Sequence, residues 1–354
     1  MNMGMPSLNI RFATTAAEVA KRATRGIVMI ILRGAVPEKN PLNLQDASEV
    51  PASVSAANRD YINMIFKGNE FSPKGVYAYF LAADAAIDEA LSWAAKQSID
   101  YIVMPTAETD GVSEQIMNWV TGQKQHKNEV RAVLSNTAAD SEYIVNFITN
   151  SITCDSKSYS AEQFTPRIAG IICGTDISHS VTFAALPEVT DCTRMSKLEM
   201  DEAEEAGKLF CYYDGEKCKL SRGVNSLTTT TADKGSAFKK IKLIDVMAVI
   251  KKDLRLLCED SYIGKYPNNY SNRCLLMSAV QSYFDELATE GVVSEPEVSF
   301  NIPAIKSAMR TAGIDYSEMT DEEVKKYDFG SSVFLRVKVH LLDAIEDIDI
   351  DIAI

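Results

Sequence analysis

Residues 75–105 read GVYAYFLAADAAIDEALSWAAKQSIDYIVMP. The first eight residues are mostly apolar and aromatic and predict a strand. Residues 84–98 predict a helix, with Asp84 placed to cap its start. Residues 99–105 predict a buried strand that Pro105 ends. A strand, a helix and a strand joined by short connections are typical of parallel strand pairing with the helix on one face of the sheet.

The same alternation extends in both directions from this stretch. Upstream, a buried strand is predicted over residues 25–34, and a short helix over 58–68 is closed by Gly68. The downstream pattern predicts a helix over 112–126, a strand over 128–135, a helix over 161–174 that contains Pro166, and a possible strand over 179–186. We therefore expect an α/β domain built on a mostly parallel sheet.

The C-terminal third has a different pattern. A hairpin over 208–223 turns at Asp214-Gly215. The longest helical signal covers 239–264, with an apolar stripe and Gly264 at its end. Further helices are predicted over 271–291, starting at Ser271, and over 301–313, and a strand is predicted over 331–342. This part is expected to be an α+β domain of helices and a sheet.

The chain finishes on EDIDIDIAI, residues 346–354, in which isoleucine alternates with aspartate. Side chains alternate between the two faces of a strand, so Ile348, Ile350, Ile352 and Ile354 would form one apolar face. Two interpretations stay open. The segment is the edge strand of its own domain, or it is donated to the sheet of a neighbouring chain.

The opposite end of the chain alternates in the same way, with Leu8, Ile10 and Phe12 on one face. Two donor-like ends can reach two different neighbours. Contacts of this heterologous kind build rings or helical lattices rather than closed dimers.

The composition sets limits on function. The 354 residues carry a formal net charge of −13, which disfavours binding to nucleic acid. The seven cysteines form no C-x-x-C pair, so we expect reduced thiols in a cytoplasmic protein. Because no secretory signal pattern and no apolar run of membrane-spanning length occur, we expect a protein made inside the cell and not inserted in a membrane.

Catalytic motifs are few. Ser178 and His179 lie near Asp176, but G-x-S-x-G is absent and adjacency in sequence does not orient a triad. Residues 328–330 read DFG without the other motifs of a kinase. No phosphate loop and no cluster of metal-ligand spacing occurs, so no catalytic residue, cofactor or metal is predicted. An α/β hydrolase-like enzyme and a non-contractile scaffold that polymerises by strand exchange remain alternatives.

Five segments together resemble one known family over essentially the full chain. The resemblance is to the tail sheath protein of contractile-tailed phages, in the compact form of Gram-positive prophages and R-type bacteriocins. The segments are GMPSLNIRF (4–12), RGIVMIILR (25–33), RGVNSLTT (222–229), the helical pair that starts KIKLIDVMAVIKKDLRLLCEDSYIGKYPNNYSN (240–272) and runs to Leu287, and VFLRVKVHLLDAIEDIDIDIAI (333–354).

The resemblance implies a structural protein and not an enzyme. Sheath subunits form stacked hexameric rings around a tail tube and link by strand exchange. The sheath contracts and drives the tube through a bacterial envelope, without nucleotide or metal. The implied partners are neighbouring sheath subunits, the tail tube protein, and the baseplate and tail terminator proteins. The resemblance also implies assembly in the bacterial cytoplasm and release by lysis. The protein would then be a virion structural protein or part of another contractile injection system.

The resemblance also implies a division of the chain and roles for particular residues. The N-terminal arm would be Leu8, Ile10 and Phe12, and the C-terminal arm Ile348, Ile350, Ile352 and Ile354. The receiving strand would carry Val333, Leu335, Val337 and Val339. The expected domains are an N-terminal arm (1–24), a small β-containing region (25–80), a central α/β sheath domain (81–235), a C-terminal inner domain (236–342) and a donor-strand arm (343–354).

Overall fold

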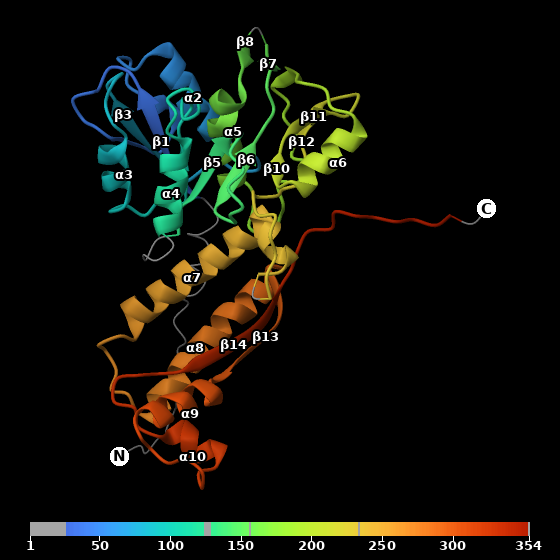
Figure 1. The fold of residues 1–354 in the computed structure, drawn as a ribbon. Coiled ribbons are helices and arrows are strands. Elements are labelled where there is room, and N and C mark those ends of the chain that lie inside the picture. Colours follow the sequence, from blue (N-terminus) through green and yellow to red (C-terminus); the bar gives the residue numbers. More distant parts are fainter. Residues whose placement is uncertain (1–25, 124–128, 156, 233, 353–354) are drawn as a thin grey trace, which may run out of the picture. The chain divides into compact units, whose positions relative to one another are not determined.

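A computed structural model describes residues 26–123, 129–155, 157–232 and 234–352 (Figure 1). The chain divides into two units. The N-terminal unit contains the described chain up to Lys252 together with the segment that begins at Leu341, and the C-terminal unit comprises Asp253–His340. The two units are described separately below.

The N-terminal unit is built on a seven-stranded sheet. Every neighbouring pair in it is parallel except for β2, which pairs antiparallel with β3 at one edge. The strand order is β10-β6-β5-β4-β1-β3-β2. The strands are β1 (Ile27–Arg33), β2 (Leu42–Leu44), β3 (Gly75–Leu81), β4 (Tyr101–Val103), β5 (Arg131–Ser135), β6 (Ile144–Phe147) and β10 (Lys208–Leu209).

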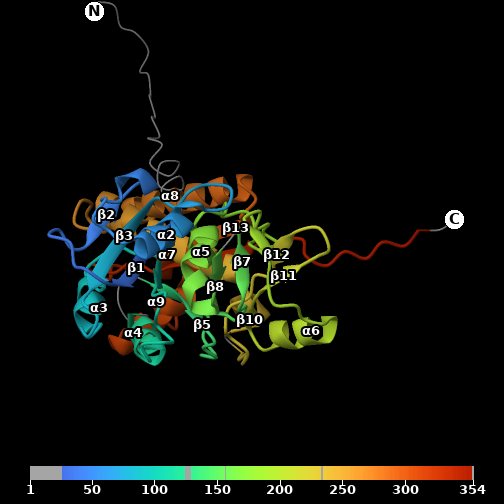
Figure 2. The same ribbon diagram turned by 90° about the horizontal axis from the view of Figure 1, so that it is seen from above.

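Helices cover both faces of this sheet. Helices α2 (Ala56–Phe66) and α5 (Ala161–Cys173) pack on one face, and α3 (Asp88–Ala94) and α4 (Ser113–Gln123) pack on the other. Figure 2 shows α2 and α4 on opposite sides of β1. Because both faces are covered, β1 is apolar along nearly its whole length, IVMIILR, rather than alternating. The predicted α/β fold with a mostly parallel sheet is confirmed.

Helices α5 and α2 approach each other at a glycine. A Cβ atom added at Gly170 would lie 2.4 Å from the carbonyl oxygen of Ile65, so only glycine fits at this crossing. Helix α5 begins with a capping box in which Ser160 and Gln163 satisfy each other's backbone N–H groups. Pro166 lies inside the helix, where it cannot donate the usual bond to the carbonyl oxygen of Glu162, and the Thr165 hydroxyl donates to that oxygen instead at 2.8 Å.

Smaller elements complete the N-terminal unit. The predicted hairpin is formed by β11 (Cys211–Tyr213) and β12 (Cys218–Leu220), with Gly215 at a φ of 108° in the turn. A three-stranded sheet contains β7 (Ile152–Cys154), β8 (Lys157–Tyr159) and β9 (Val189–Asp191). The unit also contains helix α6 (Lys197–Glu205) between β9 and β10, and the 3-10 turns η1 (Ala47–Glu49) before α2 and η2 (Ser236–Lys239) before α7.

Three local predictions are wrong. Helix α3 begins at Asp88 without a side-chain cap, so Asp84 lies in the preceding turn. Residues 179–186 form a loop rather than a strand: Val181 and Leu186 are buried, but the segment pairs with the hairpin at an isolated bridge between Ala185 and Lys219 and not along a ladder. The second long helix, α8 (Tyr270–Thr289), is capped by Asn269, whose side chain accepts a hydrogen bond from the backbone N–H of Asn272, and not by Ser271.

The C-terminal unit combines helices with a two-stranded sheet. The long helix α7 (Ile241–Ser261) begins in the N-terminal unit and ends in this one. It is followed by α8, β13 (Val293–Phe300), α9 (Ile302–Thr311), α10 (Asp321–Lys326) and β14 (Leu335–Leu341). Strands β13 and β14 pair with each other. A small apolar core under α9 and α10 contains Phe300, Ile305, Met309 and Val324.

Strand β13 was not predicted, because its sequence VSEPEVSF is charged and contains Pro296. Glu295 adopts a φ of 50°, an uncommon conformation for a residue with a side chain. The side chain of Gln281, on α8, compensates for this irregularity. It donates to the carbonyl oxygen of Pro296 at 3.0 Å and accepts from the backbone N–H of Val298 at 2.9 Å. A helix side chain thus bonds to the strand where regular pairing is disturbed.

Candidate assembly interface

The isoleucine arm, residues 348–352, is the most exposed apolar segment in the described part of the chain. Ile348, Ile350 and Ile352 have exposed fractions of 73%, 74% and 76%. Asp349 and Asp351 are also exposed, and none of these five residues belongs to a helix or strand. The fourth isoleucine, Ile354, lies outside the described residues. In the single chain, therefore, the isoleucines of the arm do not join a core.

Burial of this arm would release a substantial free energy. Transfer of a fully exposed isoleucine side chain into an apolar environment contributes about 1.5–3 kcal/mol. Fixing the backbone of each residue costs about 1–2 kcal/mol, so an arm that only adsorbs to a surface gains little. An arm that also pairs its backbone with a strand gains hydrogen bonds along its whole length.

Strand β14 has the alternation that a receiving strand requires. Leu335, Val337 and Val339 are half-buried on one face, and the intervening Arg336 and Lys338 are exposed. Val333, which we placed on this strand, lies before its first residue. Within the residues that the structure describes, the sheet holds only β13 and β14, so each strand has one edge that no other described strand covers.

Leu8, Ile10 and Phe12 lie outside the described residues. Their assignment to an interface therefore stays a prediction from the sequence.

The segment immediately before the isoleucine arm is bound to the N-terminal unit by charged side chains. The two guanidinium Nη atoms of Arg222 donate to the Asp347 carboxylate at 2.5 and 3.1 Å. This pairing holds the pKa of Asp347 below its usual range. Glu346 pairs with Lys240, and its Oε1 accepts a hydrogen bond from the Thr182 hydroxyl at 2.5 Å. No sequence motif joins these residues, and sequence reasoning missed them.

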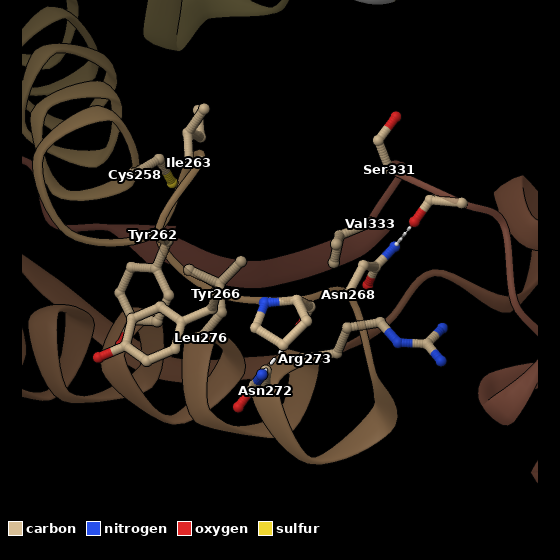
Figure 3. A pocket seen from close by; sticks show the side chains of 13 residues that line it. Cys258, Tyr262, Ile263, Tyr266, Asn268, Asn272, Arg273, Leu276, Ser331 and Val333 are labelled. Carbon is tan, nitrogen blue, oxygen red and sulfur yellow. Dashed lines mark hydrogen bonds between the residues drawn. The ribbon is translucent and has the colours of Figure 1, made fainter.

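A pocket of about 620 Å³ lies in the C-terminal unit, between the α7–α8 connection and the turn before β14 (Figure 3). Tyr262, Tyr266, Leu276 and Val333 give it a largely apolar lining. The side-chain amide of Asn268 donates to the carbonyl oxygens of residues 330 and 332, at 2.7 and 3.0 Å. These bonds tie the α7–α8 connection to the turn and hold the pocket open.

The serine and histidine at 178 and 179 do not form a catalytic pair. Ser178 donates to Asp176 at 2.7 Å, whereas His179 bonds through Nδ1 to Glu70 at 2.7 Å. The backbone N–H of Gly330 donates to Asp328 within the DFG tripeptide, which forms a turn. Burial raises the pKa of the Cys154 thiol to about 11 and that of Cys192 to about 12, so neither is a thiolate at neutral pH.

Two negative findings apply to the described residues alone. Among them, no three histidine, cysteine, aspartate or glutamate side chains come together as metal ligands would. None of the helices in the same part of the chain combines the length and the apolar character needed to cross a bilayer. The seven cysteines all fall within the described ranges and are free thiols.

Comparison with known proteins gives the family. Residues 81–226 match the central domain of phage tail sheath proteins, and residues 233–306 match the phage tail sheath C-terminal domain. The chain is 34% identical to the tail sheath protein of Clostridium phage phiCD119, over 98% of each chain. The protein belongs to the phage tail sheath family. It is therefore a structural component of a phage tail.

Solved structures of sheath proteins share its fold. The sheath tail protein of Listeria innocua superimposes with a TM-score of 0.71 at 16% identity, over 94% of this chain and 99% of that one. A sheath chain from an extracellular contractile injection system in the contracted state gives a TM-score of 0.64 at 10% identity, over 100% and 98% of the two chains. The sheath fold is thus common to phage tails and contractile injection systems.

Proposed function

We propose that this sheath protein polymerises by donating its C-terminal arm to the two-stranded sheet of a neighbouring subunit. The observation that carries the proposal is the exposure of Ile348, Ile350 and Ile352 on an unpaired segment at the end of the chain. An exposed apolar strand is an aggregation hazard unless a partner covers it. The aspartates between the isoleucines keep the free chain soluble until that partner is met.

Strand β14 supplies a suitable acceptor. A donated segment adds backbone hydrogen bonds along an open edge, and its alternate side chains enter the apolar face of the sheet. Leu335, Val337 and Val339 would form that face on the acceptor. Leu8, Ile10 and Phe12 would add a second donated strand from another neighbour. Donor and acceptor surfaces differ, so the contact repeats from subunit to subunit.

The assembled object that we propose is a contractile sheath of stacked hexameric rings around a tail tube. Its partners would be the tube protein, the baseplate and the tail terminator, and it would perform no catalysis. Assembly would take place in the bacterial cytoplasm, with release by lysis in a phage or an R-type bacteriocin particle. Within the chain, 25–80 and 81–235 would form the outer domains, and 236–342 the inner domain that faces the tube.

Replacement of Ile348, Ile350 and Ile352 by alanine tests the strand donation. We expect the triple variant to remain folded and soluble but to lose tube formation, because the arm no longer offers an apolar face. Negative-stain electron microscopy measures the tubes, and circular dichroism and thermal unfolding check the fold. Ile345→Ala is the matched control, because Ile345 is also exposed but does not share the alternate positions of the arm, and this variant should still polymerise.

Tubes that form equally well from the triple isoleucine variant, or after deletion of residues 348–354, would exclude strand donation by this arm. The same micrographs separate a contractile sheath from a static scaffold. A contractile sheath should give tubes in a long, narrow form and in a short, wide form. Tubes of one fixed geometry under all conditions would favour the static scaffold.

A further inference from the structure

One carboxylate in the C-terminal segment differs sharply from its neighbours. The Glu346 side chain is 5% exposed, whereas Ile345 is 86% exposed and the Asp347 side chain 79% exposed. In an extended chain, every second residue from Leu342 to Ile354 would lie on the same face as the isoleucines of the arm. Glu346 is the one charged residue among these positions. A charge in that position is buried only where it is paired.

The partners of Glu346 come from three separate segments of the N-terminal unit. Lys240 directly precedes α7, Arg222 follows β12, and Thr182 lies in the loop before β9. Lys240 forms an ion pair with Glu346 Oε2, and Arg222 Nε lies 3.7 Å from the same oxygen. The Thr182 hydroxyl donates to the other carboxylate oxygen, Oε1.

These partners are held in place independently of Glu346. The Thr182 Oγ1 atom accepts a hydrogen bond from the backbone N–H of Gly223 at 2.9 Å. The backbone N–H of Arg222 donates to Glu204 on α6 at 3.1 Å. The backbone N–H of Ile241 donates to the carbonyl oxygen of Gly223 at 3.0 Å, which joins the Lys240 and Arg222 segments. The three segments that carry the socket are therefore bonded to each other and to α6 without any contribution from Glu346.

We propose that Glu346 is a positioning residue that anchors the donor arm to the N-terminal unit and fixes the point from which the arm leaves its own subunit. The proposal rests on the strand donation proposed above. It adds that the arm does not start at the end of β14. Instead, it starts at the socket formed by Lys240, Arg222 and Thr182.

The anchor shortens the free segment. Without it, residues 342–354 could swing from the end of β14, a reach of about 45 Å for thirteen extended residues. With it, no more than the eight residues from 347 to 354 extend beyond the anchor, a reach of about 28 Å. Effective concentration falls roughly as the −3/2 power of linker length. Shortening the free segment from thirteen to eight residues should therefore raise the effective concentration of the arm about twofold. A fixed origin also directs the arm toward one neighbour.

The first experiment measures the anchor in the soluble, unassembled full chain. Backbone ¹⁵N order parameters of residues 343–347 are measured in Glu346→Ala, in Glu346→Gln and in the control Asp349→Asn. We expect them to fall from the range of a rigid backbone, about 0.85, to below about 0.6 in Glu346→Ala, and to fall less in Glu346→Gln, which keeps the bond from Thr182. Asp349→Asn alters an exposed carboxylate on the same arm and should give the order parameters of the unmodified chain. Unchanged order parameters in Glu346→Ala would overturn the proposal.

The second experiment measures the critical concentration for tube formation in the same three variants. We expect it to rise about two- to fivefold in Glu346→Ala and to stay unchanged in Asp349→Asn. Lys240→Met should raise it as well, whereas Lys240→Arg should not, because a cation is retained. The double variant of Glu346→Gln and Lys240→Met should show less than the sum of the single effects, because the two residues act on each other.

The two experiments together separate failure of the anchor from failure of strand donation. An arm that loosens in Glu346→Ala while the critical concentration stays constant would overturn the positioning role. Loss of tubes on deletion of 348–354, combined with normal assembly of all Glu346 and Lys240 variants, would reject the anchor and leave donation standing. Normal assembly after that deletion would reject donation itself.

Discussion

Strand β1 and the isoleucine arm have similar apolar residues and opposite surroundings. Ile30 and Ile31 on β1 are fully buried between two layers of helices, with strands paired on both edges. Ile350 on the arm is about three-quarters exposed and has no strand partner among the described residues. The difference lies in where the partners are. The central sheet finds them within its own chain, and the arm does not.

The two sheets of the molecule differ in the same way. The seven-stranded sheet of the N-terminal unit is covered on both faces and ends on an antiparallel edge strand. The β13–β14 sheet has two strands in the described residues, and two strands alone are marginal in water. It depends on α8 and α9 for its core, and it has room for additional strands.

The largest difference is expected when one isoleucine in each region is replaced by alanine. Ile30→Ala leaves a cavity in a packed core and should lower the free energy of unfolding by about 3–4 kcal/mol. Ile350→Ala removes an exposed side chain and should change that free energy by no more than about 0.5 kcal/mol. Urea denaturation of the soluble chain measures both. A comparable loss in the two variants would mean that the arm is packed in its own subunit.

A second prediction concerns the helices that close the central sheet. Gly170→Ala places a methyl group against the backbone of α2 and should destabilise the fold by about 2–3 kcal/mol. Gly122→Ala, on α4, is the matched control, because a Cβ there meets nothing within 4 Å. The control should be neutral or stabilising by up to about 1 kcal/mol, since alanine favours helix. Thermal unfolding distinguishes them, and equal midpoints would contradict the close approach.

The smallest effect should come from the open sheet. Gln281→Met removes both hydrogen bonds from α8 to β13 and should cost about 1–2 kcal/mol. Hydrogen exchange at the Val298 amide should accelerate, because its acceptor is lost. Gln115→Met, at an exposed bond to Asp88 on the other unit, should leave that amide unaffected. An unchanged Val298 amide would show that β13 holds itself in place without the helix.

The sequence predicts the central fold well because its signals are local. The strand and helix patterns between residues 75 and 135 each lie within one contiguous run, and the structure places β3, α3, β4, α4 and β5 there in order. Helix boundaries are weaker signals. Asp84 has the residue type of a cap, but the backbone makes another turn first, and α3 starts at Asp88.

The errors occur where tertiary contacts replace local preference. Residues 179–186 have the apolar pattern of a strand, yet Leu186 is buried in a loop beside the hairpin. Strand β13 contradicts strand propensity with Pro296, and Gln281 supports it from a different element. The anchor joins Thr182, Arg222 and Lys240 to Glu346 across more than a hundred residues of sequence. The sequence does contain one signal for it: Glu346 is the single charged residue on the alternate positions that also carry Ile348 and Ile350.

The strict alternation of isoleucine and aspartate in the arm also determines the register in which the arm would pair with a strand of a neighbouring subunit. Side chains in a strand alternate with a period of two, so a slip of one residue would turn every isoleucine outward and every aspartate inward. Burying unpaired carboxylates costs several kcal/mol each, far more than thermal energy. If the arm is donated as proposed, pairing that is out of register by one residue would therefore be disfavoured by the carboxylates that it buries.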